Sequence, residues 1–331
     1  MDLFTHVIFA YLLSFALTGG QAPVYIAAGA LAGGLPDSDI LVFPLAKRFP
    51  LLSHHGITHS ILGVTGFAVA GAILGPFIVG GASPLFLFMF MELGGLSHLV
   101  TDGLTNFAVP PFAPFSSVQV HMDTDRPISL FTLPLSIASL VILLSERGTV
   151  PLPVWIYTAW ALLAIYVAYI AFRAFGRWKA GKACKENGYT AVVPTGSPFS
   201  WFLVDEKERP GSWQMRFARY GVGAGVTSPQ KNISLSTASS GSGPVQSPEE
   251  AIQRSYRQSM DASRFLSISY RYAQVSGGGE KYEVHWFSIE WLIMGRSPGV
   301  LATVDAATGE VKVRSAWFNL NKLGQSLAHD L

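Results

Sequence analysis

The chain has 331 residues, of which half are apolar and only 13% are charged, and its formal net charge is +2. The charged residues concentrate in the second half, which is the pattern of a membrane region followed by a water-soluble one. So small a net charge, without a basic face interleaved with aromatic residues, excludes nucleic acid as an expected partner. The single cysteine, Cys184, excludes an internal disulfide and a cysteine-based zinc cage.

The first half of the chain is built from repeated apolar runs of roughly 17 to 23 residues, about the length that a helix needs to cross a bilayer. No basic residue precedes the first run, so we expect it to be a retained helix and not a signal peptide. The sequence predicts an all-α, polytopic membrane domain over residues 1–178. Its expected helices, about six, lie at residues 3–18, 22–34, 60–79, 84–101, 128–144 and 153–175.

Basic residues fall almost entirely on one side of such a bundle. The connections on the opposite side contain one basic residue, Arg147, whereas the remaining Lys and Arg of this region gather on the side that holds the N-terminus. By the positive-inside rule that side is cytoplasmic. We therefore expect a multi-pass protein of the cytoplasmic membrane, in contact with the lipid bilayer, with both termini in the cytoplasm.

Residues 179–331 have the pattern of a small, soluble α+β domain. Serine, glycine and proline dominate residues 228–247, which predicts a mobile loop. A helix is expected at residues 248–260, with Ser247 as its N-cap. Strands rich in β-branched and aromatic residues are expected at 201–204, 213–220, 265–275, 282–294 and 300–304, the last returning through a turn into 311–313.

Polar residues cluster at four predicted helix ends, all on the predicted cytoplasmic side. Ionisable groups at membrane depth are costly, so their gathering there indicates a functional site. The clusters are Thr5-His6, Leu35-Pro36-Asp37-Ser38-Asp39, His54-His55-Gly56-Ile57-Thr58-His59-Ser60 and the segment from His98 to Thr105.

His98 and Asp102 are four residues apart, so on a helix they share one face and can hold one ion together. Neutral imidazole with carboxylate suits zinc, and with more oxygen ligands it suits manganese or iron. Thr5, Thr58 and Thr101 each directly precede a candidate ligand. We expect them to cap helix starts or to orient the ligands.

Other polar residues keep two interpretations at this stage. Gly56 breaks the helix that would align His55 with His59, so His54 and His55 are ligands, proton shuttles or simply exposed. Glu92, inside a predicted span, is either a polar contact between helices or a catalytic base. A second metal could be completed in the following loop by His121, Asp123 and Asp125, whereas His285 and His329 are expected to be structural.

The order and spacing of these motifs resemble those of membrane-bound, metal-dependent hydrolases of the DUF457 type, described as inner-membrane hydrolases. The resemblance covers residues 1 to 175 and includes Pro114-Phe115-Ser116. That family is distantly similar to zinc-dependent phospholipase C and to P1-type nucleases, which are helical phosphodiesterases. The resemblance implies metal-ligand roles for His6, Asp37, His59, His98 and Asp102, with Asp102 as a bridge between two ions.

The sequence and the resemblance together predict a membrane-bound, metal-dependent hydrolase. Metal-activated water would attack a phosphoester, such as a phospholipid, at the cytoplasmic interface. Asp37, Asp39 or His55 is the expected proton acceptor. One alternative is a non-catalytic membrane scaffold with a structural metal, whose cytoplasmic domain binds a protein partner by strand pairing. A transporter is a further alternative, which requires charged residues in mid-span, and Glu92 alone is close to such a position.

Overall fold

The computed structural model describes the chain except residues 40–55, 210–211, 228–230, 237–242, 263–270, 289–295 and 320–331. It forms two compact units, Met1–Phe175 and Gly176–Leu331. His54 and His55 lie outside the described residues.

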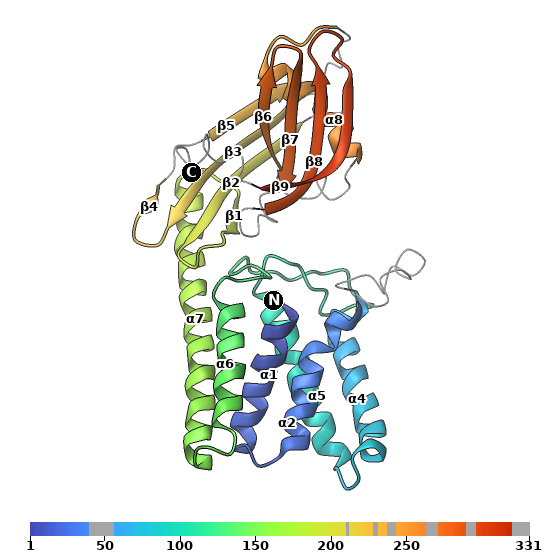
Figure 1. The fold of residues 1–331 in the computed structure, drawn as a ribbon, viewed down its shortest axis with the longest axis vertical. Helices are drawn as coiled ribbons and strands as arrows, with labels where there is room; N and C mark the ends of the chain where they lie inside the picture. Colours follow the sequence, from blue (N-terminus) through green and yellow to red (C-terminus); the bar gives the residue numbers. More distant parts are fainter. Residues whose placement is uncertain are drawn as a thin grey trace. The chain divides into compact units, whose positions relative to one another are not determined.

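The first unit is helical, and its helices run alongside one another in Figure 1. The helices consist mainly of apolar residues and are bounded by polar or small ones. Asp2, for example, caps the start of α1 by accepting a hydrogen bond from the Thr5 backbone N–H. The elements are α1 (Leu3–Thr18), α2 (Pro23–Gly34), the 3₁₀ turns η1 (Pro36–Ser38) and η3 (Ile57–His59), α4 (Ile61–Ile78), α5 (Pro84–Gly103), α6 (Thr132–Glu146) and α7 (Leu152–Glu186).

Small residues allow α1, α2 and α5 to approach closely, as the glycine-rich sequence of α2 predicts. A Cβ added to Gly29 would lie 2.2 Å from Ser14 Oγ, and one added to Gly94 would lie 2.1 Å from the Gly29 carbonyl oxygen. Backbones in such contact leave no room for side chains between the helices. The close packing fixes the ends of these helices relative to one another.

Three of these helices are long and apolar enough to cross a membrane, namely α4, α5 and α7. The other three, α1, α2 and α6, have 16, 12 and 15 residues. At 1.5 Å per residue such helices are shorter than a ~30 Å hydrocarbon core. Helix length and composition therefore support three candidate spans and not the expected six crossings. The structure also extends α7 well beyond the predicted end at residue 175.

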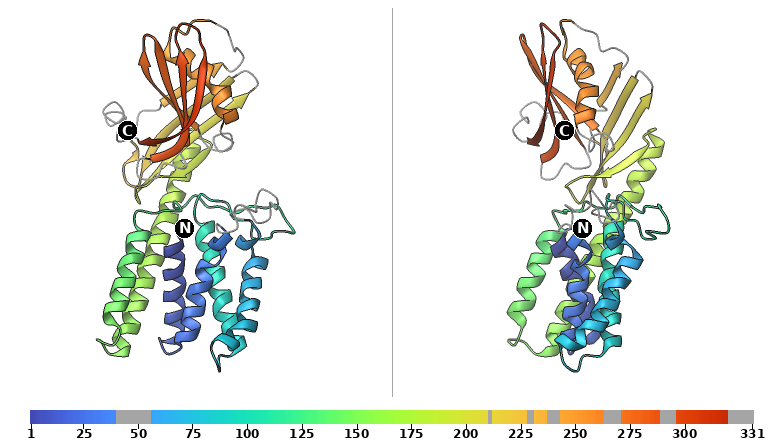
Figure 2. Two further views of the ribbon diagram at one scale, coloured as in Figure 1. Left: turned by 45° about the vertical axis from the view of Figure 1, so that its right-hand side comes forward. Right: turned by 90° about the vertical axis from the view of Figure 1, so that its right-hand side faces the viewer.

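The second unit is rich in β-sheet, and α8 packs against its strands (Figure 2). One antiparallel sheet has the order β1-β2-β3-β4 with β5 also paired to β3, and the other is the meander β6-β7-β8-β9. Trp213, Tyr256 and Trp286 pack on one another and join α8 to both sheets, with ring centroids 5.4 to 5.8 Å apart. The elements are β1 (Ala191–Pro194), β2 (Ser200–Arg209), β3 (Ser212–Gly221), β4 (Gly225–Val226), β5 (Lys231–Ser236), α8 (Pro248–Ala262), β6 (Arg271–Gly278), β7 (Lys281–Ser288), β8 (Arg296–Asp305) and β9 (Val311–Asn319).

The structure corrects one segment of this unit. The prediction of a loop throughout residues 228–247 is wrong at β5, which pairs with β3 in the register Ile233 to Met215. Ile233 and Leu235 alternate with polar residues, a strand pattern that the surrounding serines and glycines obscure in the sequence. Elsewhere the predicted hairpin after residue 304 is confirmed as β8 and β9, and Ser247 caps α8 through the Glu250 backbone N–H.

Candidate metal centre

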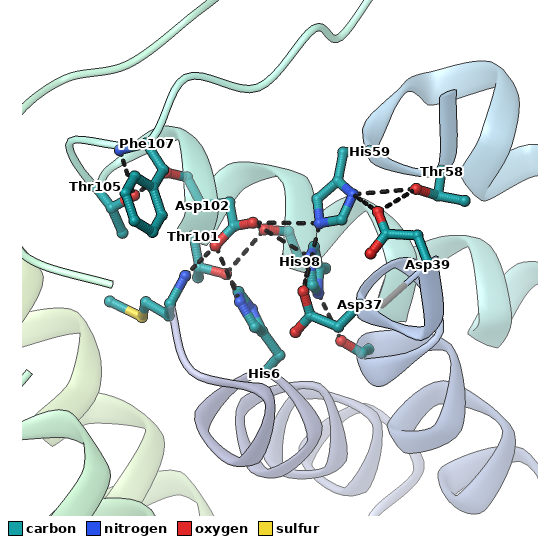
Figure 3. A network of polar contacts seen from close by, with 12 residues as sticks. His6, Asp37, Asp39, Thr58, His59, His98, Thr101, Asp102, Thr105 and Phe107 are labelled. Carbon is teal, nitrogen blue, oxygen red and sulfur yellow. Dashed lines mark hydrogen bonds and ion pairs between the residues drawn. The ribbon is translucent and has the colours of Figure 1, made fainter. Parts of the chain in front are cut away.

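Four segments of the first unit bring ionisable side chains to one end of the helices (Figure 3). His6 lies in the first turns of α1, Asp37 lies in η1 just after α2, and His59 lies in η3 just before α4. His98 and Asp102 lie one turn apart near the end of α5. The pairs α1 with α2 and α4 with α5 thus leave this end and return to it.

Asp37, His59, His98 and Asp102 form a compact group that could hold a metal ion. Each offers one ligand atom, and these atoms all lie within 4.8 Å of one another. Nε2 of His59 is 3.4 Å from Asp37 Oδ1 and 3.7 Å from Asp102 Oδ2. The two histidine side chains are fully buried, and Asp37, with 10% of its side chain exposed, is the most accessible of the four.

The tautomer of His98 fits a cation at this position. Its Nδ1 lies 2.8 Å from the Gly33 carbonyl oxygen, which can only accept, so Nδ1 carries the proton. In a neutral ring Nε2 is then a lone pair, and it lies 3.3 Å from Asp102 Oδ2 and 3.8 Å from Asp37 Oδ1. A lone pair close to two carboxylates is unfavourable unless a positive charge lies between them. The residues present therefore fit a divalent ion.

His59 is oriented by a second carboxylate. Its Nδ1 lies 3.2 Å from Asp39 Oδ2, which also accepts a hydrogen bond from the Thr58 hydroxyl. Burial alone would lower the pKa of His59, but the contacts with Asp37, Asp39 and Asp102 outweigh it and raise this pKa to about 9. For Asp37, burial opposes ionisation, yet the contact with His59 holds its pKa below the usual value.

Asp102 uses its two oxygens differently. Oδ2 faces His59 and His98, whereas Oδ1 lies 3.0 Å from His6 Nε2 and contacts the Met1 amino group. His6 Nδ1 lies 3.0 Å from the Thr101 hydroxyl, and the His6 and His98 rings stack with centroids 3.7 Å apart. His6 is therefore next to the four-residue group, connected to it by Asp102.

The structure brings some of the predicted site residues together and places others elsewhere. His6, Asp37, His59, His98 and Asp102 come together, and Asp39 stands behind His59 as an orienting group. His121 and Asp123 contact each other, while Asp125 accepts a hydrogen bond from the Tyr169 hydroxyl and pairs with Arg173. Glu92 accepts a hydrogen bond from Thr65 of α4, which is the interhelical contact that the sequence allowed. His55, the remaining predicted catalytic residue, is not among the described residues.

Sequence reasoning missed the Gly33 carbonyl and the buried group around Asp125. Gly33 could have been suspected from the small residues of α2, but a backbone acceptor leaves no signature in side-chain spacing. Asp125 follows Asp123 and precedes a basic residue in a loop, a pattern that usually indicates an exposed turn. Its burial depends on Tyr169 and Arg173 of the distant α7.

The apolar helices and the buried group at their ends define a membrane protein with a candidate metal centre. The family model of the YdjM inner membrane proteins matches residues 1–180, more than half of the chain, and the chain belongs to this family. The expectation of an inner-membrane family is confirmed to that extent. No curated protein and no solved structure matches the chain significantly.

Proposed function

We propose that this protein is a membrane-bound, metal-dependent hydrolase that cleaves phosphoesters, with phospholipids as the leading substrate class. The observation that carries the proposal is the buried group Asp37, His59, His98 and Asp102, whose ligand atoms lie within 4.8 Å of one another. Two imidazoles with carboxylates are a ligand set of zinc hydrolases, and manganese or iron would also fit.

The roles of the side chains follow from their contacts. Asp39 and Thr58 hold the His59 ring, the Gly33 carbonyl holds the His98 ring, and Thr101 holds His6. When bound, a divalent ion would lower the pKa of a water molecule and neutralise charge on the phosphoryl oxygens. Asp37, the most accessible carboxylate of the group, is the proton acceptor that the geometry favours. Asp102 would bridge to a second ion beside His6, since its two oxygens face the two positions.

We further propose that the metal-bearing end lies at the cytoplasmic face, with both ends of the helical unit on that side. Each pair of helices starts and returns there, including α6 and α7, because Ser129 before α6 contacts Tyr169, which lies midway along the long helix α7. An even number of crossings follows if the short helices α1, α2 and α6 cross a locally thinned bilayer. A reporter fused to the C-terminus should be active only in its cytoplasmic form.

The alternative is a scaffold in which the ion is structural and the second unit recruits a protein partner. The two proposals differ in hydrolysis and not in metal content. Detergent-purified protein should therefore be tested for bound metal and, before and after chelation, for hydrolysis of phosphodiester and phospholipid substrates.

Two variants test the site directly. His98→Ala and Asp102→Ala should each lose most of the bound metal and all metal-dependent hydrolysis, whereas His329→Ala should lose neither. Full metal content in folded His98→Ala protein would show that the ligand assignment is wrong. Loss of metal from both variants, with no hydrolysis by the metal-loaded parent, would favour the scaffold.

A further inference from the structure

We propose that residues 106–122, the connection that follows α5, insert into the lipid–water boundary of the membrane on the metal-bearing side. We call this segment the boundary loop. None of its residues is Asp, Glu, Lys or Arg, and it contains three phenylalanines and three prolines. Water-exposed loops are usually polar, so this composition is unusual for a segment that lies outside the helices.

The boundary loop has a defined conformation. The backbones of Val109 and Val120 exchange two hydrogen bonds of 3.0 and 2.9 Å, which close the loop at its base. Near its tip, the Phe112 carbonyl accepts hydrogen bonds from the backbone N–H groups of Phe115 and Ser116. The side chains of the tip are therefore presented in fixed directions.

The phenylalanines at the tip of this loop are exposed, whereas the alanine between them is buried. Phe115 is 86% exposed, and Phe112 and Val118 are each 54% exposed, whereas Val109 and Ala113 are buried. A loop in water would be expected to cover its phenylalanines and expose its alanine. The observed arrangement suits a segment whose outer face contacts lipid.

The position of the loop identifies the bilayer as its partner. The backbone N–H of Ile61, the first residue of α4, donates to the Pro111 carbonyl, so the loop is attached where a candidate membrane span begins. Ile61 and Leu62 of that helix are 43% and 46% exposed. The exposed apolar surface thus continues from the span into the loop at the level where hydrocarbon meets headgroups. Ser116, Ser117 and Gln119 supply uncharged polar groups that suit this depth.

Insertion at this point would place lipid beside the candidate metal centre. The loop begins four residues after Asp102, just beyond the end of α5. The segment that follows the loop returns there, since the backbone N–H of Thr124 donates to the Leu104 carbonyl. Insertion itself requires neither metal nor catalysis, so it can be tested independently of the proposed hydrolysis.

Spin labelling in lipid nanodiscs tests the proposal. In a Cys184→Ala background, Phe115→Cys is labelled with a nitroxide, and the full-length protein is placed in discs of phosphatidylcholine and phosphatidylglycerol. Collisions with oxygen, which concentrates in lipid, are compared with collisions with a water-soluble nickel chelate. Ile73→Cys on α4, 61% exposed, is the lipid reference, and Thr308→Cys in the exposed turn between β8 and β9 is the water reference.

The label at Phe115 should give an oxygen-to-nickel collision ratio several-fold above that at Thr308 and close to that at Ile73. A ratio equal to that at Thr308 would place the loop in water and overturn the proposal. Protection from both reagents would show that protein covers the loop, either the second unit or another copy, and would overturn it as well. Val118→Cys provides a second position, and removal of metal should change neither result.

Discussion

Metal binding should depend steeply on pH because His59 is held in its protonated form when no metal is bound. Its pKa of about 9 lies two pH units above neutrality. A metal at Nε2 must displace that proton, which at pH 7 costs about 3 kcal/mol of the binding free energy. Between pH 7 and pH 9 the apparent affinity should rise about tenfold per pH unit and then level off.

Replacing one carboxylate tests the cause of this dependence. Asp39→Asn keeps an acceptor for His59 Nδ1 and removes a negative charge 3.2 Å away, so the pKa of His59 should fall and fewer protons should be released on binding. The matched control, Asp123→Asn, changes a carboxylate that contacts His121 outside the group. It should release as many protons as the parent.

Calorimetric titration of metal into chelator-treated protein at pH 7 measures proton release if it is repeated in buffers of different ionisation enthalpy. Competition with a metal chelator between pH 6.5 and about pH 9 gives the affinity slope. An affinity that does not change with pH, or equal proton release from the parent and Asp39→Asn, would refute the reasoning. His59 would then not be a ligand through Nε2, or its charge would not be set by Asp39.

Three further predictions concern other parts of the chain. Gly33→Ala should lower metal affinity in a chelator competition assay, because the new Cβ would lie 2.6 Å from Ala10 Cβ and displace the carbonyl that holds His98. Gly66→Ala is the control: a Cβ there meets open space, so metal affinity should not change. Asp125→Asn should reduce unfolding free energy in detergent by about 2 kcal/mol, because it weakens buried contacts with Tyr169 and Arg173. Burial lowers the pKa of His285, so the unfolded chain binds a proton at this residue more readily than the folded protein does. The melting temperature of the second unit should therefore fall as the pH drops below about 6.5, and it should fall less in His285→Gln.

The helices could be predicted closely from the sequence because long apolar runs bounded by Gly, Pro and polar residues leave few alternatives. Five of the predicted starts, those of α1, α2, α4, α5 and α7, lie within one residue of the observed ones. The meeting of the polar clusters could also be predicted, since successive antiparallel helices bring every second connection to the same end of a bundle. The number of membrane crossings could not be predicted. The short, glycine-rich sequence of α2 is compatible with a short span and equally with a helix that packs against its neighbours without crossing.

The contacts that orient the ligands could be predicted only in part. Thr58 contacts the ring of His59, the ligand that it precedes, as its position in the sequence suggested. Thr101 precedes Asp102 but contacts His6 of α1, which its position in the sequence did not suggest. The spacing of Asp37 and Asp39 in the sequence does not by itself show which carboxylate is a metal ligand and which one orients His59. The two roles are set by the turn η1, which directs Asp37 toward His98 and leaves Asp39 against Nδ1 of His59.

The composition of the buried group favours a catalytic ion over a structural one. Structural zinc sites usually close four protein ligands around the metal, with thiolates prominent among them, whereas catalytic sites combine imidazole and carboxylate and keep a position open for water. Cysteine plays no part in this group, and one carboxylate, Asp37, keeps part of its side chain exposed. Three carboxylates are gathered around His59, and they supply the negative charge that a divalent ion would neutralise once His59 has lost its proton. If the ion only stabilised the fold, Asp37→Asn should unfold the helical unit as metal is lost. If the ion acts on substrate, the same variant should keep the fold and much of the metal while the rate of hydrolysis falls by at least about a hundredfold. Measuring thermal unfolding together with the hydrolysis rate distinguishes these two outcomes.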